Sequence, residues 1–144
     1  MKKTISIVNR SASVEEITKR LMPVFEEQRT ELVLLFGSAA SGTMHKRSDI
    51  DLAFLFEGPV DILALTNKVI QLLRTDNVDV VDLRHAPPLL RYLVAKNGRV
   101  LYERRQGLFN VFYSLAFRMY VDSRKLREAQ RAAMSQYLAV RGLS

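Results

Sequence analysis

The sequence predicts an α/β (α+β) domain, with a small mixed central sheet of about four strands flanked by helices and a long C-terminal helix. Short apolar runs alternate along the chain with stretches of helical periodicity, the pattern of one sheet covered by helices. From Leu108 onward the apolar residues keep a helical spacing. The length of 144 residues is that of one ordinary domain.

The first part of the chain predicts one helix and two strands. Ser13 and Glu16 form a capping box, which indicates the start of a helix that ends near Gln28. The apolar runs 32–36 and 50–56 fit buried strands, and a glycine follows each run.

The second part alternates helix and strand more closely. An apolar stripe over 61–73 predicts a helix, and the valine-rich segment 78–83 predicts a strand. Two prolines begin a helix over 87–97, with Gly98 just past its end. A short strand over 99–102 precedes the long helix.

Composition narrows the function classes. Lysine and arginine number 22 and aspartate and glutamate 15, so the formal net charge is +7. A basic chain can bind nucleic acid, nucleotide or an acidic protein, and an ordinary basic surface is an equally good interpretation. Cysteine is absent, which excludes thiol catalysis, disulfides and Cys-ligated zinc. No apolar run approaches the roughly 20 residues of a membrane span and no signal peptide is visible, so we expect a cytoplasmic protein.

One segment between the first two strands combines residues that suit phosphate and metal chemistry. Gly37 follows the first strand and lets the backbone approach a ligand closely, and Ser38 adds a hydroxyl and an N–H group. Asp49 and Asp51 stand two apart on the second strand, so both carboxylates project from one face. Two adjacent carboxylates repel unless a cation lies between them, and hard oxygen ligands select magnesium or manganese.

The third strand offers a further carboxylate. Asp79 and Asp82 both lie there, on opposite faces, so only one of them can face the pair. A Gly-Ser pair alone is usually a turn, and a lone Asp-x-Asp is often a surface strand. The two together, each beside an apolar strand, favour a functional site.

These residues resemble a known signature. Gly37-Ser38, ten residues and then Asp49-x-Asp51 is the pattern of the nucleotidyltransferase superfamily that includes DNA polymerase beta. The short chain resembles a minimal nucleotidyltransferase (MNT) domain. The resemblance extends over about 31–105. The further matching residues and segments are Gly42, Ser48, 78–81, 86–91 and 98–103. We therefore divide the chain into an MNT domain over 1–105 and a C-terminal helical extension over 106–144, packed on the same domain.

The resemblance implies a metal-dependent transfer of AMP from ATP. Asp49, Asp51 and Asp79 would be both catalytic residues and ligands of two Mg²⁺ ions, or of Mn²⁺, with Asp79 accepting the proton of the attacking hydroxyl. Asp82 remains the alternative third carboxylate.

The nucleotide would be bound by Gly37, Ser38, Ser48 and Arg47. Gly37 and Ser38 would hold its β and γ phosphates. Many members carry a basic residue before the second glycine, whereas this chain has Ser41 there, so Lys46 or Arg47 would supply that phosphate contact.

The resemblance also implies a partner. MNT proteins of this length are typically encoded beside a HEPN RNase toxin, and the implied function is an antitoxin that adds AMP to a toxin tyrosine within a hetero-oligomeric complex. The alternatives are neutralisation by binding alone, nucleotidyl transfer to a small molecule or RNA, and direct RNA binding, for which no aromatic recognition motif is present. The long helix is a candidate docking element: Phe112 is expected to pack on the sheet, leaving Tyr113 or Phe117 for a partner.

Overall fold

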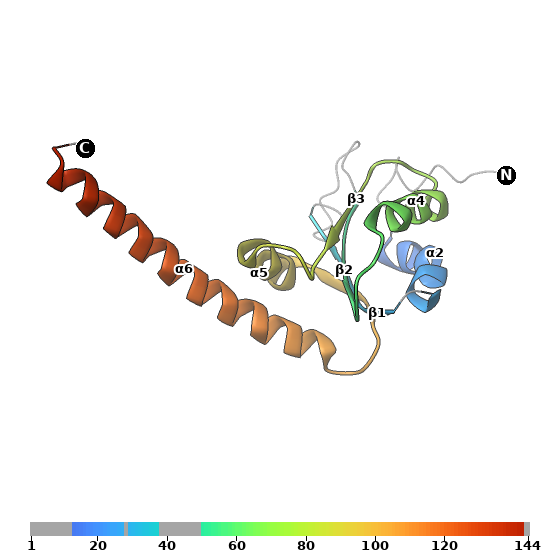
Figure 1. Cartoon of the computed structure of the whole chain (residues 1–144). Helices are drawn as coiled ribbons and strands as arrows, with labels where there is room; N and C mark the ends of the chain where they lie inside the picture. The colour runs from blue at the N-terminus through green and yellow to red at the C-terminus, as the bar shows by residue number, and fades with distance from the viewer. Residues whose placement is uncertain (1–12, 28, 38–49, 143–144) are drawn as a thin grey trace.

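The computed structural model describes residues 13–27, 29–37 and 50–142. The elements, labelled as in Figure 1, are α2 (Val14–Glu27), β1 (Thr30–Phe36), β2 (Ile50–Phe56), α4 (Ile62–Leu73), β3 (Val78–Asp82), α5 (Pro88–Asn97), β4 (Arg99–Glu103) and α6 (Leu108–Val140).

The four strands form one mixed sheet in the order β3-β2-β1-β4, which confirms the predicted fold class. β1 is antiparallel to both of its neighbours, whereas β2 and β3 are parallel. A parallel pair needs a crossover connection, and α4 provides it between β2 and β3. The first strand is longer than predicted, because Thr30 pairs with Phe56 across an irregularity in the β1–β2 register.

Alternation along the strands divides the core between the two faces of the sheet. On β1, Val33 and Leu35 belong to a cluster with α2 and α4, whereas Leu32 and Leu34 belong to a cluster with α5 and α6. Figure 1 shows the sheet nearly edge-on between these two helical layers. Both faces are therefore covered, which explains why the strands read as continuous apolar runs.

Side-chain caps begin two helices where the sequence predicts them. Ser13 Oγ accepts a hydrogen bond of 3.0 Å from the Glu16 N–H, and Asp61 Oδ1 accepts one of 3.1 Å from Ala64. Gly98 ends α5 as predicted but not in the left-handed conformation, since its φ is −80°. A Cβ at Gly98 would lie 2.5 Å from the Val94 carbonyl oxygen, so only glycine fits at this position without a clash.

Arg91 joins α5 to its two neighbours on the same face of the sheet. Its Nη1 donates a hydrogen bond to the Leu83 carbonyl, just after β3, and its guanidinium lies over the Phe112 ring of α6 at 5.1 Å. Partial burial lowers the pKa of the Arg91 guanidinium. Its Nε is buried without a hydrogen-bond partner among the described residues.

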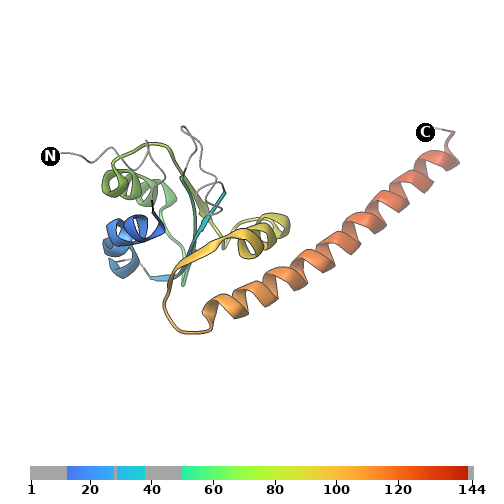
Figure 2. The same cartoon turned by 180° about the vertical axis from the view of Figure 1, so that it is seen from behind.

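The long C-terminal helix is one continuous helix of 33 residues. Its first part packs on the sheet and on α5, with Phe112 and Ala116 buried, so the expectation for Phe112 is confirmed. Tyr92 of α5 stacks on Tyr120 at 4.6 Å, close to where α6 leaves the body. Figure 2 shows the rest of α6 projecting past α5, with the end of the helix far from the sheet.

Among the helices that the structure describes, none combines the length and the apolarity of a membrane-crossing segment.

Replacing Phe54 by alanine tests the core on the α2–α4 face. The side chain is fully buried and stacks on Phe56 at 5.6 Å, so Phe54→Ala should lower the free energy of unfolding by about 3–5 kcal/mol. Urea denaturation measures this change. Leu63→Ala on α4 is the control, because its side chain is 72% exposed and its loss should change stability by about 0.5 kcal/mol or less.

Candidate active site

Asp51 and Asp79 are brought together by the register of the two parallel strands. They are directly paired across β2 and β3, each at the second residue of its strand. Adjacent strands lie about 4.8 Å apart, and paired residues project from the same face. That face is the one covered by α5 and α6, because Ala53 on β2 and Val81 on β3 pack in the same cluster. The two carboxylates are therefore neighbours at one edge of that layer.

The end of β1 adds Gly37 to this pair. Phe36 is paired with Asp51, and Gly37 follows with a φ of +78°, in the left-handed region. A Cβ on Gly37 would overlap Asp51 Oδ2. The carboxylate thus lies directly against the Gly37 backbone, and any larger residue would displace it.

Asp82 occupies a different environment from Asp79. It is paired with Phe54, and alternation along β3 puts it on the opposite face. Its Oδ1 accepts a hydrogen bond of 3.1 Å from the Arg84 N–H, and its Oδ2 lies 2.9 Å from His85 Nδ1. The Asp82 side chain therefore supports the turn that follows β3, whereas Asp79 is exposed beside Asp51.

The carboxylates present suit a hard divalent cation. Two like charges on one face of neighbouring strands repel, and a cation between them would remove that repulsion. Oxygen ligands alone favour Mg²⁺ or Mn²⁺. Within the described ranges no three acidic or histidine side chains form one metal-binding group, and Asp49 lies outside those ranges.

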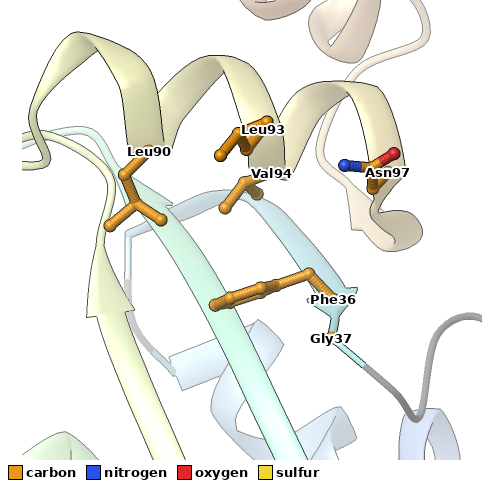
Figure 3. Close-up of a pocket in the computed structure, with 6 residues that line it drawn as sticks. All are labelled: Phe36, Gly37, Leu90, Leu93, Val94 and Asn97. Carbon is orange, nitrogen blue, oxygen red and sulfur yellow. The ribbon is translucent and has the colours of Figure 1, made fainter.

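A pocket of about 490 Å³ opens beside the carboxylates, between the end of β1 and α5. Figure 3 shows the Phe36 ring beneath α5, with Asn97 at the end of the helix near Gly37. Its lining is Phe36, Gly37, Leu90, Leu93, Val94 and Asn97. The walls are mainly apolar and the Asn97 amide is the polar side chain among them. Gly37 borders both this pocket and the Asp51 carboxylate.

The predicted site residues divide into two groups. Gly37, Asp51 and Asp79 lie together, whereas Ser38, Arg47, Ser48 and Asp49 lie outside the described residues. The pocket was not predicted. Its α5 residues stand at positions i, i+3, i+4 and i+7 from Leu90, a spacing that is visible in the sequence but that also describes a helix packed in a core.

Known proteins resemble this chain over much of its length. The family profile described as polymerase beta, nucleotidyltransferase, matches residues 19–107. A protein adenylyltransferase MntA from Aphanizomenon flos-aquae (strain 2012/KM1/D3) is 24% identical over 139 residues, which cover 88% of this chain and 91% of that protein. A second protein of that name, from Shewanella oneidensis, is 40% identical over 81 residues, or 54% of this chain and 58% of that protein.

Solved structures extend the likeness to the three-dimensional fold. A crystal structure of a toxin–antitoxin with AMP-PNP contains a chain that is 31% identical, with a TM-score of 0.70. The alignment covers 85% of this chain and 98% of that one. A structure of tri-AMPylated Shewanella oneidensis HEPN toxin in complex with MNT antitoxin gives a TM-score of 0.67 at 26% identity, over 85% of this chain and 99% of that one.

The profile spans well over half of the chain and includes β1, β2 and β3, the strands that place Gly37, Asp51 and Asp79. The chain belongs to the polymerase beta nucleotidyltransferase family.

Proposed function

We propose that this protein transfers AMP from ATP to a tyrosine hydroxyl of a cognate HEPN toxin, and that it thereby acts as an antitoxin in the cytoplasm. The observation that carries the proposal is the pairing of Asp51 with Asp79, against the backbone of Gly37. This is the acidic edge that a nucleotidyltransferase needs beside a backbone that can approach phosphate.

The relatives support the choice of substrate and partner. Two of them are named protein adenylyltransferases, and one related structure is of a toxin–antitoxin with AMP-PNP, an ATP analogue. Another is of an MNT antitoxin in complex with a tri-AMPylated HEPN toxin. The Aphanizomenon adenylyltransferase and the antitoxin of the HEPN–MNT complex align with 88% and 85% of this chain, so the proposal draws on most of its length.

We assign the divalent cations, two Mg²⁺ or Mn²⁺ ions, to Asp49, Asp51 and Asp79. Of these three residues the structure describes two. Asp51 lies against the Gly37 backbone, and the exposed Asp79 is paired with it across β2 and β3. When bound, the cations neutralise charge on the phosphates and on the attacking and leaving oxygens.

The chain's own residues bind and orient the reactants. Gly37 and Ser38 bind the β and γ phosphates through backbone N–H groups and the serine hydroxyl, and Arg47 and Ser48 complete the nucleotide contacts. Asp79 accepts the proton of the acceptor hydroxyl, for which its exposed carboxylate is accessible to an incoming protein. The acceptor oxygen bonds to the α phosphorus, the bond from that phosphorus to the bridging oxygen breaks, and pyrophosphate leaves.

The nucleoside is assigned to the pocket beneath α5. Its apolar walls suit the faces of a base, and the Asn97 amide can both donate and accept hydrogen bonds at a base edge. Gly37 connects the pocket with the acidic edge, so one ligand can reach both with its base and its phosphates.

Exchanging each β3 aspartate for asparagine distinguishes the two candidates for the third carboxylate. Asp79→Asn should lower the rate of AMP transfer to the toxin by roughly 10²-fold or more, since the proton acceptor is lost. Asp82→Asn should leave most of the rate, because Asp82 faces Arg84 and His85. Intact mass of the toxin after incubation with ATP and Mg²⁺ measures the transfer. The reverse order of effects would assign the role to Asp82, and a toxin silenced without any gain of mass would indicate neutralisation by binding.

A pair of glycine substitutions tests the contact between Gly37 and Asp51. Gly37→Ala and Gly107→Ala both put a side chain at a positive φ, which costs about 1 kcal/mol of stability in each case. Only the alanine at 37 overlaps a carboxylate, since nothing lies within 4 Å of a Cβ at 107. Gly37→Ala should therefore reduce AMP transfer by roughly 10²-fold, and Gly107→Ala should not. Equal activities would show that the position of Asp51 against the backbone is unimportant.

Two leucines of α5 test the nucleoside pocket. Leu93 lines it and Leu89 does not, although both are partly exposed, at 42% and 46%. Leu93→Glu should raise the KM for ATP about tenfold, since it removes apolar contact with the base and puts a charged group in a mainly apolar pocket. Leu89→Glu controls for the added charge on α5. If both variants keep the parent KM, the nucleoside lies elsewhere.

A further inference from the structure

The outer part of α6 has no covering within the described structure. After Ala116 no residue of the helix is buried, although the helix continues to Val140. At about 1.5 Å per residue, the part beyond Tyr120 is about 30 Å long. Figures 1 and 2 both show it standing clear of the sheet and of the other helices. An unpacked helix of this length gains little stability from propensity alone, so a partner surface is expected.

Most residues on one side of this outer part are apolar, and Asp122 and Gln130, four residues before and after Leu126, are the polar residues among them. Its large side chains are strongly exposed: Leu126 at 58%, Met134 at 57%, Tyr137 at 52% and Val140 at 77%. Ala129 and Ala133 fall on the same side at helical spacing. Leu115 and Met119, at 44% and 41%, extend the stripe back towards the body. We call this set of eight residues the α6 stripe.

A hollow on the same side of α6 has the residue spacing of a helix-packing site. Gln130, Ala133, Met134 and Tyr137 line it, and these residues stand at i, i+3, i+4 and i+7. Four residues in that arrangement form the hole that receives one side chain from a facing helix. The small Ala133 leaves the space, and the Arg141 guanidinium lies over the Tyr137 ring at 3.7 Å beside it. The spacing of the residues that line the hollow therefore favours binding of a helix over binding of an extended segment.

The charges around the stripe favour an acidic occupant. From Arg118 to the end of α6 the side chains include five cations and two acids, namely Arg118, Arg124, Lys125, Arg127 and Arg131 against Asp122 and Glu128. Glu128 and Arg124 pair with each other, since Glu128 Oε2 lies 3.3 Å from Arg124 Nε, so four cations and one acid remain. A second copy of α6 would bring the same positive charge to the interface, whereas an acidic helix would be attracted.

We propose that the 106–144 extension is a docking arm, and that the α6 stripe binds an amphipathic helix with acidic flanks on the cognate HEPN toxin. This identification of the occupant rests on the function proposed above. The arm is fixed to the catalytic body by buried Phe112 and by the stacking of Tyr92 on Tyr120. A toxin bound to the arm stays close to the catalytic body. This raises the effective concentration of its acceptor hydroxyl at the acidic edge.

Two glutamate substitutions on the arm test the proposal. Ala133→Glu fills the hollow and adds a charge that repels an acidic helix, whereas Ser135→Glu adds the same charge on the opposite side of α6. Both full-length variants keep every residue of the catalytic body, so their unfolding transitions should match the parent. The measured quantities are the Kd for the purified toxin and the KM and kcat of AMP transfer to it. Ala133→Glu should raise Kd and KM at least tenfold with kcat unchanged, and Ser135→Glu should change each less than twofold.

Three results would overturn the docking surface or its occupant. Equal Kd values for parent and Ala133→Glu would show that the toxin does not use the stripe. A free chain that is dimeric, and that Ala133→Glu makes monomeric, would assign the stripe to a second copy. Tighter toxin binding by Ala133→Glu would show that the occupant is not acidic. Absence of AMP transfer by the parent chain would instead refute the proposed function, and the Kd comparison would still decide the docking surface.

Discussion

The register of β1, β2 and β3 is the constraint on which the site depends. One set of backbone hydrogen bonds pairs Phe36 with Asp51 and Asp51 with Asp79. A slip of one residue would turn the carboxylates to the other face of the sheet. Apolar side chains on both faces of β1 and β2 oppose such a slip. Successive side chains pack alternately in the two core clusters, and a shift by one residue would exchange them between the clusters. The apolar core therefore fixes the positions of the charges.

Glycines allow the close approaches that this arrangement needs. At Gly37 the backbone approaches a carboxylate, and at Gly98 the end of α5 passes against β1, where a Cβ would lie 3.2 Å from a Leu34 methyl carbon. The second contact holds α5 near the end of β1, so the pocket and the acidic edge share a border. The same absence of a Cβ thus allows the approach of the Asp51 carboxylate at one position and helix packing at the other.

The sequence was sufficient for the sheet and its helices because periodicity reports which faces are buried. It also limited the third carboxylate to Asp79 or Asp82, since alternation puts the two on opposite faces. It could not choose between them, because strand register depends on partners distant in the chain. The pocket beneath α5 was beyond prediction for a related reason: Leu90 and Leu93 look like core residues until the position of Phe36 is known. The isolation of outer α6 was equally hidden, since an apolar stripe predicts a covered face and not what covers it.

The uneven charge of the chain now has a physical interpretation. In the proposed function, cations between Asp51 and Asp79 and the nucleotide would remove the repulsion between these carboxylates and the phosphates, so the acidic edge is assigned to metal binding rather than to direct phosphate binding. The cations of outer α6 lie on an arm that leaves the body beside α5, and not around the pocket. Their charge is therefore better suited to a second macromolecule than to ATP. The two proposals therefore assign separate roles to the two charged regions, nucleotide chemistry to the sheet edge and partner binding to outer α6.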